Sequence, residues 1–289
     1  MNKLYLLLRY AIPEERFEDA YTALSDTPHI GIIESYDELS IYFLHACTED
    51  FQAAMITHVH NQFMRFNIPA VLQESAIIQE ENWHQQWEDS IDPVWVNERI
   101  VITPSWKYNT VSHADIPLII DPQMSFGTGH HETTRMMVQL LELSVQHGDF
   151  WIDVGTGTGV LAILAWKLGA ARLYALDNDT WSIHNAVENF ARNGIPLEHN
   201  TAIHIEQNNI NTTELPSCHG IAANLHCNLI MHNIAKFYNA LREYSGTLVV
   251  SGLLRYDAQT VLDVAKQCGF ILQKCIDDGE WIAMQWSAR

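Results

Sequence analysis

The chain has 289 residues, of which 47% are hydrophobic and 18% charged, and its formal net charge is −19 at pH 7. This length and composition allow a sizeable buried core, which excludes disordered and fibrous classes and favours two domains. The acidic balance disfavours direct nucleic-acid binding, which needs cations against phosphates, and favours a basic macromolecular partner.

Five cysteines are scattered along the chain, and no two of them have the two-residue spacing of a zinc or redox motif. This favours reduced thiols over disulfides or a structural metal site. The apolar run over residues 4–8 ends at Arg9 and is too short for a signal peptide, and no run is long enough to span a membrane. We therefore expect a cytoplasmic protein.

The first 80 residues alternate between strand-like and helix-like patterns. The expected strands cover residues 4–10, 30–34, 39–45 and 71–79, and the expected helices begin after Pro13 and at Glu49. This βαββαβ order is typical of a ferredoxin-like α+β domain, a fold that carries no chemistry by itself. We expect residues 1–80 to form a substrate-recognition domain.

Residues 81–92 are polar, contain Trp83 and Trp87, and are expected to form a helical linker to a larger domain over 93–289. In that domain, apolar strand segments alternate with helical patterns, which predicts an α/β fold with a doubly wound, mostly parallel sheet. The clearest expected strands cover residues 150–154, 172–176, 201–205, 220–223, 246–251, 270–277 and 281–286.

A glycine-rich segment, Asp-Val-Gly-Thr-Gly-Thr-Gly over 153–159, joins a strand to a helix. Glycines allow a sharp turn and close approach of a ligand, and the helix start adds unpaired N–H groups. Asp177, at the end of the next strand, can accept hydrogen bonds from ribose hydroxyls. The glycine spacing resembles S-adenosylmethionine-dependent methyltransferases more than dinucleotide enzymes. A dehydrogenase and a ligand-free turn are the alternatives.

A second segment, Phe-Gly-Thr-Gly-His-His-Glu-Thr-Thr, covers 126–134. Its glycine and hydroxyl residues suit a loop that closes over a ligand and caps the next helix. Adjacent histidines rarely bind one metal ion, and the zinc pattern H-E-x-x-H is absent, so no metal site is expected. A plain helix-capping loop is the alternative.

These two segments stand in a fixed order with Asp121-Pro122, Asp177 and Ala223-Asn224-Leu225. Together they resemble the ribosomal protein L11 methyltransferase family (PrmA), as do Glu81-Asn82-Trp83, Pro104-Ser105-Trp106 and Ser251-Gly252-Leu253-Leu254. The resemblance covers the linker and the carboxyl-terminal two thirds of the chain, and the leading βαββαβ domain matches in kind. It implies a class I (Rossmann-like) methyltransferase domain over 93–289.

The resemblance implies a cytoplasmic enzyme that transfers methyl groups from S-adenosylmethionine to lysine side-chain and amino-terminal amines of a basic large-subunit ribosomal protein. The cofactor contacts are expected at Thr134, Gly155, Asp177, Asn224, Phe126 and Gly157. We expect a monomer that contacts no membrane and no nucleic acid. Leu225-His226-Cys227-Asn228 departs from the small or apolar residues that family members often carry there, which affects the acceptor pocket.

Methyl transfer from a sulfonium expels a neutral leaving group, so the protein mainly supplies proximity and alignment. The acceptor must be an uncharged amine, and a lysine, with a pKa of about 10.4, must first lose a proton. Asn224, at a strand end, can accept a hydrogen bond from that amine, and His131 is a candidate proton acceptor. A strand-end turn and a packed histidine are the alternatives.

Two other functions stay open at the level of the sequence. The first is an S-adenosylmethionine-dependent methyltransferase that acts on another protein, on RNA or on a small molecule. The Asn224-Leu225 pair is not the Asn/Asp-Pro-Pro-Tyr run typical of enzymes that methylate planar amino groups, which argues against DNA adenine or glutamine as acceptor. The second is a binding module without turnover, which the intact glycines and Asp177 disfavour.

Overall fold

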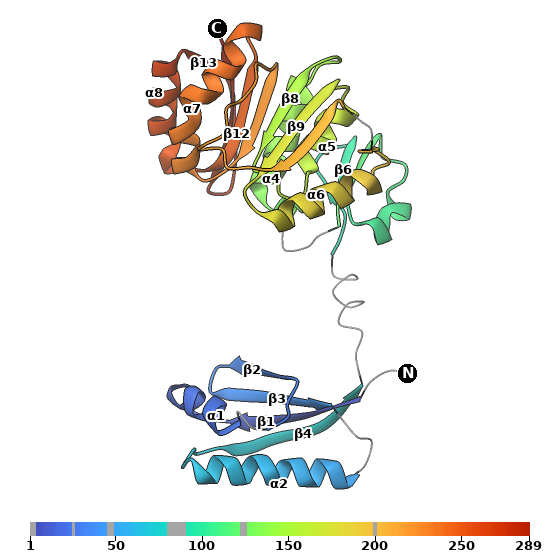
Figure 1. The fold of residues 1–289 in the computed structure, drawn as a ribbon, viewed down its shortest axis with the longest axis vertical. Coiled ribbons are helices and arrows are strands. Elements are labelled where there is room, and N and C mark those ends of the chain that lie inside the picture. The colour runs from blue at the N-terminus through green and yellow to red at the C-terminus, as the bar shows by residue number, and fades with distance from the viewer. Residues whose placement is uncertain (1–3, 25–26, 45–48, 80–90, 122–125, 199–200) are drawn as a thin grey trace. The chain divides into compact units, whose positions relative to one another are not determined.

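The computed structural model describes residues 4–24, 27–44, 49–79, 91–121, 126–198 and 201–289, and it divides into two compact units, Met1–Ser90 and Ile91–Arg289 (Figure 1). The helical linker predicted over 81–92 lies outside the described residues except at Ile91 and Asp92, which are not helical. No helix within the described ranges is long and apolar enough to cross a membrane.

The first unit has a four-stranded antiparallel sheet in the order β2-β3-β1-β4. Its elements are β1 (Leu4–Ala11), η1 (Glu14–Arg16), α1 (Phe17–Leu24), β2 (Gly31–Ser35), β3 (Glu38–Leu44), α2 (Glu49–Arg65) and β4 (Val71–Gln79). Alternate residues of β1, among them Leu6, Leu8 and Tyr10, share one core with both helices. The ferredoxin-like order expected from the sequence is confirmed.

The second unit is built on a seven-stranded sheet in the order β10-β9-β8-β11-β12-β14-β13. The first five strands are parallel, and β14 pairs antiparallel with both β12 and β13. The strands are β8 (Phe150–Val154), β9 (Arg172–Asp177), β10 (Ile203–Gln207), β11 (Gly220–Asn224), β12 (Thr247–Leu254), β13 (Phe270–Asp278) and β14 (Trp281–Ala288). The mostly parallel α/β sheet is therefore confirmed.

Helices cover this sheet and bury both of its faces. They are α4 (Glu132–Ser144), α5 (Val160–Lys167), α6 (Thr180–Arg192), α7 (Cys227–Leu241) and α8 (Ala258–Cys268), with short turns η3 (Arg242–Tyr244) and η4 (Arg255–Asp257). In β8, Trp151 belongs to one core, whereas Ile152 and Val154 belong to the other. Every residue of β8 is buried, as expected of a parallel strand covered on both sides.

Three details differ from the sequence-based expectation. A separate three-stranded sheet forms from β5 (Val94–Trp95), β6 (Ile100–Thr103) and β7 (Ile116–Ile119), with η2 (Ser105–Thr110) between the last two. Strand β10 begins two residues later than predicted, at Ile203, which pairs with Leu173. Helix α6 begins at Thr180, whereas the apolar spacing predicts a helix over 182–193; Asp179 caps it by accepting a hydrogen bond from the Trp181 N–H.

Candidate functional site

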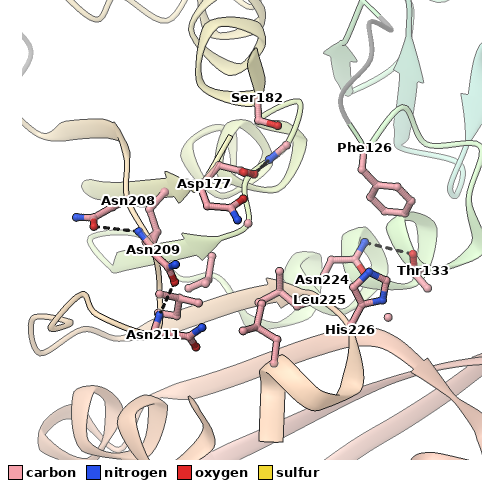
Figure 2. Close-up of a pocket in the computed structure, with 18 of the residues that line it drawn as sticks. Phe126, Thr133, Asp177, Ser182, Asn208, Asn209, Asn211, Asn224, Leu225 and His226 are labelled. Carbon is pink, nitrogen blue, oxygen red and sulfur yellow. Dashed lines mark hydrogen bonds between the residues drawn. The ribbon is translucent and has the colours of Figure 1, made fainter. Parts of the chain in front are cut away.

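A cavity of about 530 Å³ lies at the carboxyl ends of β8, β9, β10 and β11. This edge is where ligands bind in open parallel α/β sheets. Figure 2 shows Asp177, Ser182, Asn208 and Asn209 on one side of the cavity, and Phe126, Thr133 and Asn224 on the other. Of the residues predicted for the site, it is lined by Phe126, His131, Gly155, Gly157, Asp177 and Asn224.

The glycine loop after β8 turns back over the end of β9. The backbone N–H groups of Gly155 and Thr156 both donate to the carbonyl of Leu176, at 2.8 and 3.0 Å. Gly157 has φ +53, and a Cβ atom there would lie 2.3 Å from the carbonyl oxygen of Phe126. Any larger residue at this position would therefore force the two loops apart.

The segments 126–134 and 153–159, which the sequence singles out, are joined by hydrogen bonds. The Thr158 N–H donates to the Phe126 carbonyl at 2.9 Å, and the buried Thr158 hydroxyl donates to the Gly127 carbonyl at 2.9 Å. Phe126 is held against the glycine loop through its backbone, while its side chain is 52% exposed. The 126–134 segment therefore borders the cavity, although residues 122–125 lie outside the described part of the chain.

Asp177 ends β9 and faces the cavity (Figure 2). Its Oδ2 accepts from the Gly157 N–H at 2.9 Å, and its Oδ1 accepts from the Asp179 N–H at 3.0 Å. Both bonds fix the orientation of the carboxylate, and each oxygen keeps a lone pair for a ligand. Asp177 can therefore accept hydrogen bonds from hydroxyl groups of a ligand in the cavity.

Asp153 lies directly beneath the glycine loop and is only 3% exposed. Its Oδ2 accepts from the Thr156 hydroxyl at 2.7 Å and from the Ala162 N–H at 3.2 Å. Burial raises the pKa of this carboxyl to about 7, and these two hydrogen bonds only partly oppose the shift. Its other oxygen, Oδ1, has no hydrogen-bond partner among the described residues.

Three polar side chains form a hydrogen-bonded chain along one wall of the cavity. His131 caps α4, because its Nδ1 accepts from the Thr133 N–H at 3.2 Å and lies 2.8 Å from the Thr133 hydroxyl. The Asn224 Nδ2 donates to the same hydroxyl at 3.2 Å (Figure 2). The His131 ring also packs edgewise between Phe126 and Trp281, with ring centroids 5.2 and 4.9 Å away.

Thr134 is the one predicted site residue that does not line the cavity; its neighbour Thr133 does. The first turn of α4 points Thr134 into the interior, where it is 1% exposed. Its hydroxyl has no hydrogen-bond partner within the described ranges. A buried hydroxyl without a partner is costly, which makes this atom available to a ligand that reaches it.

Several lining residues were not identified from the sequence. Thr133 stands inside the second signature segment, so its place at the second position of a capped helix was a signal that could have been used. The others come from strand ends, loops and the first turn of α6, far apart in the sequence, among them Ser182, Asn208, Asn209, Asn211 and Trp281. No described group of three or more His, Cys, Asp or Glu side chains could hold a metal ion.

Comparisons with known proteins identify the family of this chain. The family model described as ribosomal protein L11 methyltransferase (PrmA) matches residues 15–289. A protein of that name from Listeria monocytogenes is 33% identical over 278 residues, which span 94% of this chain and 84% of the relative. One from Anoxybacillus flavithermus is 32% identical over 262 residues, spanning 89% and 80% of the two chains.

A solved structure is also similar. The ribosomal protein L11 methylase from Lactobacillus delbrueckii subsp. bulgaricus superposes with a TM-score of 0.62 at 26% identity, over 69% of this chain and all of that one. The family match over nearly the whole sequence confirms the resemblance on which the cofactor and reaction were expected. The chain belongs to the ribosomal protein L11 methyltransferase family (PrmA), and it is an S-adenosylmethionine-dependent methyltransferase.

Proposed function

We propose that this chain methylates lysine side-chain and amino-terminal amines of ribosomal protein L11. The observation that carries the proposal is the placement of Asn224 at the cavity wall, with its amide N–H donated to Thr133 and its carbonyl oxygen left for an acceptor. The choice of L11 as the substrate rests on the names of the relatives. Since ribosomal proteins are made in the cytoplasm, we place the reaction there.

The residues present fit S-adenosylmethionine. Asp177 faces the cavity with acceptor oxygens for ribose hydroxyls, and Gly155 and Gly157 leave the adjoining wall free of side chains. Two of the buried oxygens that have no partner among the described residues, Thr134 Oγ1 and Asp153 Oδ1, belong to residues next in sequence to ones that line the cavity. A cofactor with an ammonium and a carboxylate offers partners for such atoms.

When bound, S-adenosylmethionine supplies an electrophilic methyl group on a sulfonium sulfur. The chain's own residues then have to hold a neutral amine in line with that methyl group. Asn224 can accept an N–H of the amine and so direct its lone pair. The apolar lining contributed by Leu225, Leu229 and Trp281 favours the neutral amine over the charged ammonium.

His131 supports this reaction better as an orienting group than as a proton acceptor. Its Nδ1 already accepts the Thr133 N–H and is therefore occupied in capping α4. Its ring is held between Phe126 and Trp281, which restricts its rotation. We propose that the acceptor amine loses its proton to solvent before it enters the cavity.

We propose that the first unit, residues 1–80 in the sequence-based division, selects the protein substrate. Every residue that we assign to the cofactor and to the acceptor lies in the second unit. The first unit exposes carboxylates at Glu14, Glu15 and Glu18, which would attract a basic protein. We also propose that the active species is a monomer.

The proposal is tested by incubating the chain with labelled S-adenosylmethionine and ribosomal proteins from cells that lack this methylation. The expected result is label in L11, located by peptide mass spectrometry on lysine and amino-terminal amines. A matched reaction with Asp177→Ala controls for label transferred without the enzyme. Label in RNA or in other proteins, with none in L11, would contradict the proposed substrate.

A further inference from the structure

The Asn224 carboxamide has two ends of opposite hydrogen-bonding character, and only one of them suits methyl transfer. The carbonyl oxygen accepts an N–H from the incoming amine and leaves the amine lone pair free to attack. The amide NH₂ would instead donate to that lone pair and block it. What fixes the amide in the useful orientation therefore affects the rate of the reaction.

We propose that His131 and Thr133 act as positioning residues that fix the orientation of the Asn224 amide. His131 Nδ1 accepts a hydrogen bond from the Thr133 N–H at 3.2 Å. Because a backbone N–H can only donate, Nδ1 must carry a lone pair and no hydrogen.

The same lone pair determines what the Thr133 hydroxyl can do. Thr133 Oγ1 lies 2.8 Å from His131 Nδ1, and since Nδ1 has no hydrogen to give, the hydroxyl donates its own; the N–H and the O–H of Thr133 then share the one lone pair of Nδ1. A hydroxyl has only one hydrogen, so towards Asn224 it can act only as an acceptor. At 3.2 Å it meets the Asn224 Nδ2, which donates to it (Figure 2).

The direction of every bond in this chain follows from the helix cap. If the hydroxyl hydrogen were free, Thr133 could donate to the Asn224 carbonyl, and the amide could turn over with its NH₂ towards the acceptor. His131 removes that possibility by taking the hydrogen. The N-terminal cap of α4 thus carries a second function besides satisfying an orphan N–H. This inference rests on the proposed function, because it requires an amine acceptor at Asn224.

The test compares Thr133→Val, which removes the hydroxyl but keeps the shape, with Thr133→Ser, which keeps the hydroxyl. Thr133→Val is expected to lower kcat for L11 about 10- to 100-fold, the scale on which misorientation acts. Its Kd for S-adenosylmethionine should stay within about twofold of wild type, and Thr133→Ser should restore kcat. Thr103→Val, another buried threonine outside the cavity, is the matched control and should leave kcat unchanged.

A double-mutant cycle separates positioning from simple support of the fold. In an Asn224→Ala background, Thr133→Val should cause no further loss of kcat, because its effect passes through the missing amide. Thermal melts identify variants that fail to fold, in which case Thr133→Ala replaces Thr133→Val. A wild-type kcat in folded Thr133→Val would overturn this inference and leave the proposed function standing. A further loss of kcat when Thr133→Val is added to Asn224→Ala would do the same. Absence of L11 methylation by the wild-type chain would overturn the proposed function and this inference with it.

Discussion

The two units of this chain are both built on sheets, but they place their polar groups differently. The antiparallel sheet of the first unit buries one face, and its edge strand β2 ends in three exposed residues. The second unit buries both faces of its central strands, so β8 is buried along its whole length. The polar side chains of β9 and β11 that line the cavity, Asp177 and Asn224, stand at the carboxyl ends of these strands.

This difference explains why we assign the chemistry to one unit and substrate selection to the other. At the carboxyl ends of parallel strands, Gly155, Asp177 and Asn224 come from three different strands and still line the same space. Antiparallel neighbours have no shared carboxyl edge, and the first unit shows no comparable polar constellation among its described residues. Its exposed surface suits recognition of another protein.

The largest expected effect tests this division by removing residues 1–80. The truncated chain should bind S-adenosylmethionine with wild-type affinity, because its cavity and both large cores lie in the second unit. Methylation of L11 should fall to background. Calorimetry measures the first quantity and mass spectrometry of L11 the second. Wild-type methylation by a folded truncated chain would contradict a recognition role for the first unit.

The next effect concerns cofactor binding within the second unit. Asp177→Ala removes a carboxylate that faces the cavity and that also orders Gly157 and Asp179. Loss of charged hydrogen bonds is worth about 1.5–3 kcal/mol, so the Kd for S-adenosylmethionine should rise by roughly 10- to 150-fold. Asp263→Ala, an exposed carboxylate on α8, is the control. An unchanged Kd in folded Asp177→Ala would remove Asp177 from the cofactor site.

A third effect is the stability that the variant Asp153→Asn gains over wild type as the pH rises. The pKa of this carboxyl is about 7 in the folded protein and 3.8 for an ordinary exposed aspartate, so the unfolded state binds fewer protons between these two pH values. The stability that the raised pKa of Asp153 contributes is fully present below the unfolded-state pKa. It is lost as the pH rises through the folded-state pKa. Asp153→Asn, which stays neutral, should therefore gain roughly 2 kcal/mol over wild type between about pH 5 and pH 8.

Thermal melts of Asp153→Asn and wild type across that pH range measure this gain. An equal difference in melting temperature at every pH would show that Asp153 does not titrate as described. If Asp153 Oδ1 also contacts the cofactor, the same variant should bind S-adenosylmethionine more weakly. A stabilised protein with weaker binding would show that the second unit carries a stability cost at its site.

The smallest effect distinguishes two neighbouring threonines. Thr134→Val removes a buried hydroxyl that has no partner in the described structure, so the fold should tolerate it. If that hydroxyl contacts S-adenosylmethionine, the Kd should rise severalfold, equivalent to about 1 kcal/mol. Thr133→Val should instead spare the Kd and lower kcat. Identical behaviour of the two variants would contradict their separate roles.

The sequence predicted the order of elements well because periodic apolar residues report burial locally. The strand over 150–154 and the glycine loop that follows it have the predicted limits. Position within the site was harder to predict. Thr134 was expected at the cavity, but the helical turn directs Thr133 there instead. Trp281 could not be found from local pattern, because only the antiparallel pairing of β14 with β12 brings it to the cavity.

The assignment of chemistry to the second unit and of substrate selection to the first is tested most directly by measuring substrate preference with and without the first unit. The full chain and the second unit, residues 91–289, are each given L11 and a short lysine-containing peptide in one reaction. We expect the full chain to prefer L11 strongly, and the second unit to methylate both acceptors slowly and without preference. Retention of the full preference for L11 by the second unit would contradict the assignment of chemistry and selection to different units.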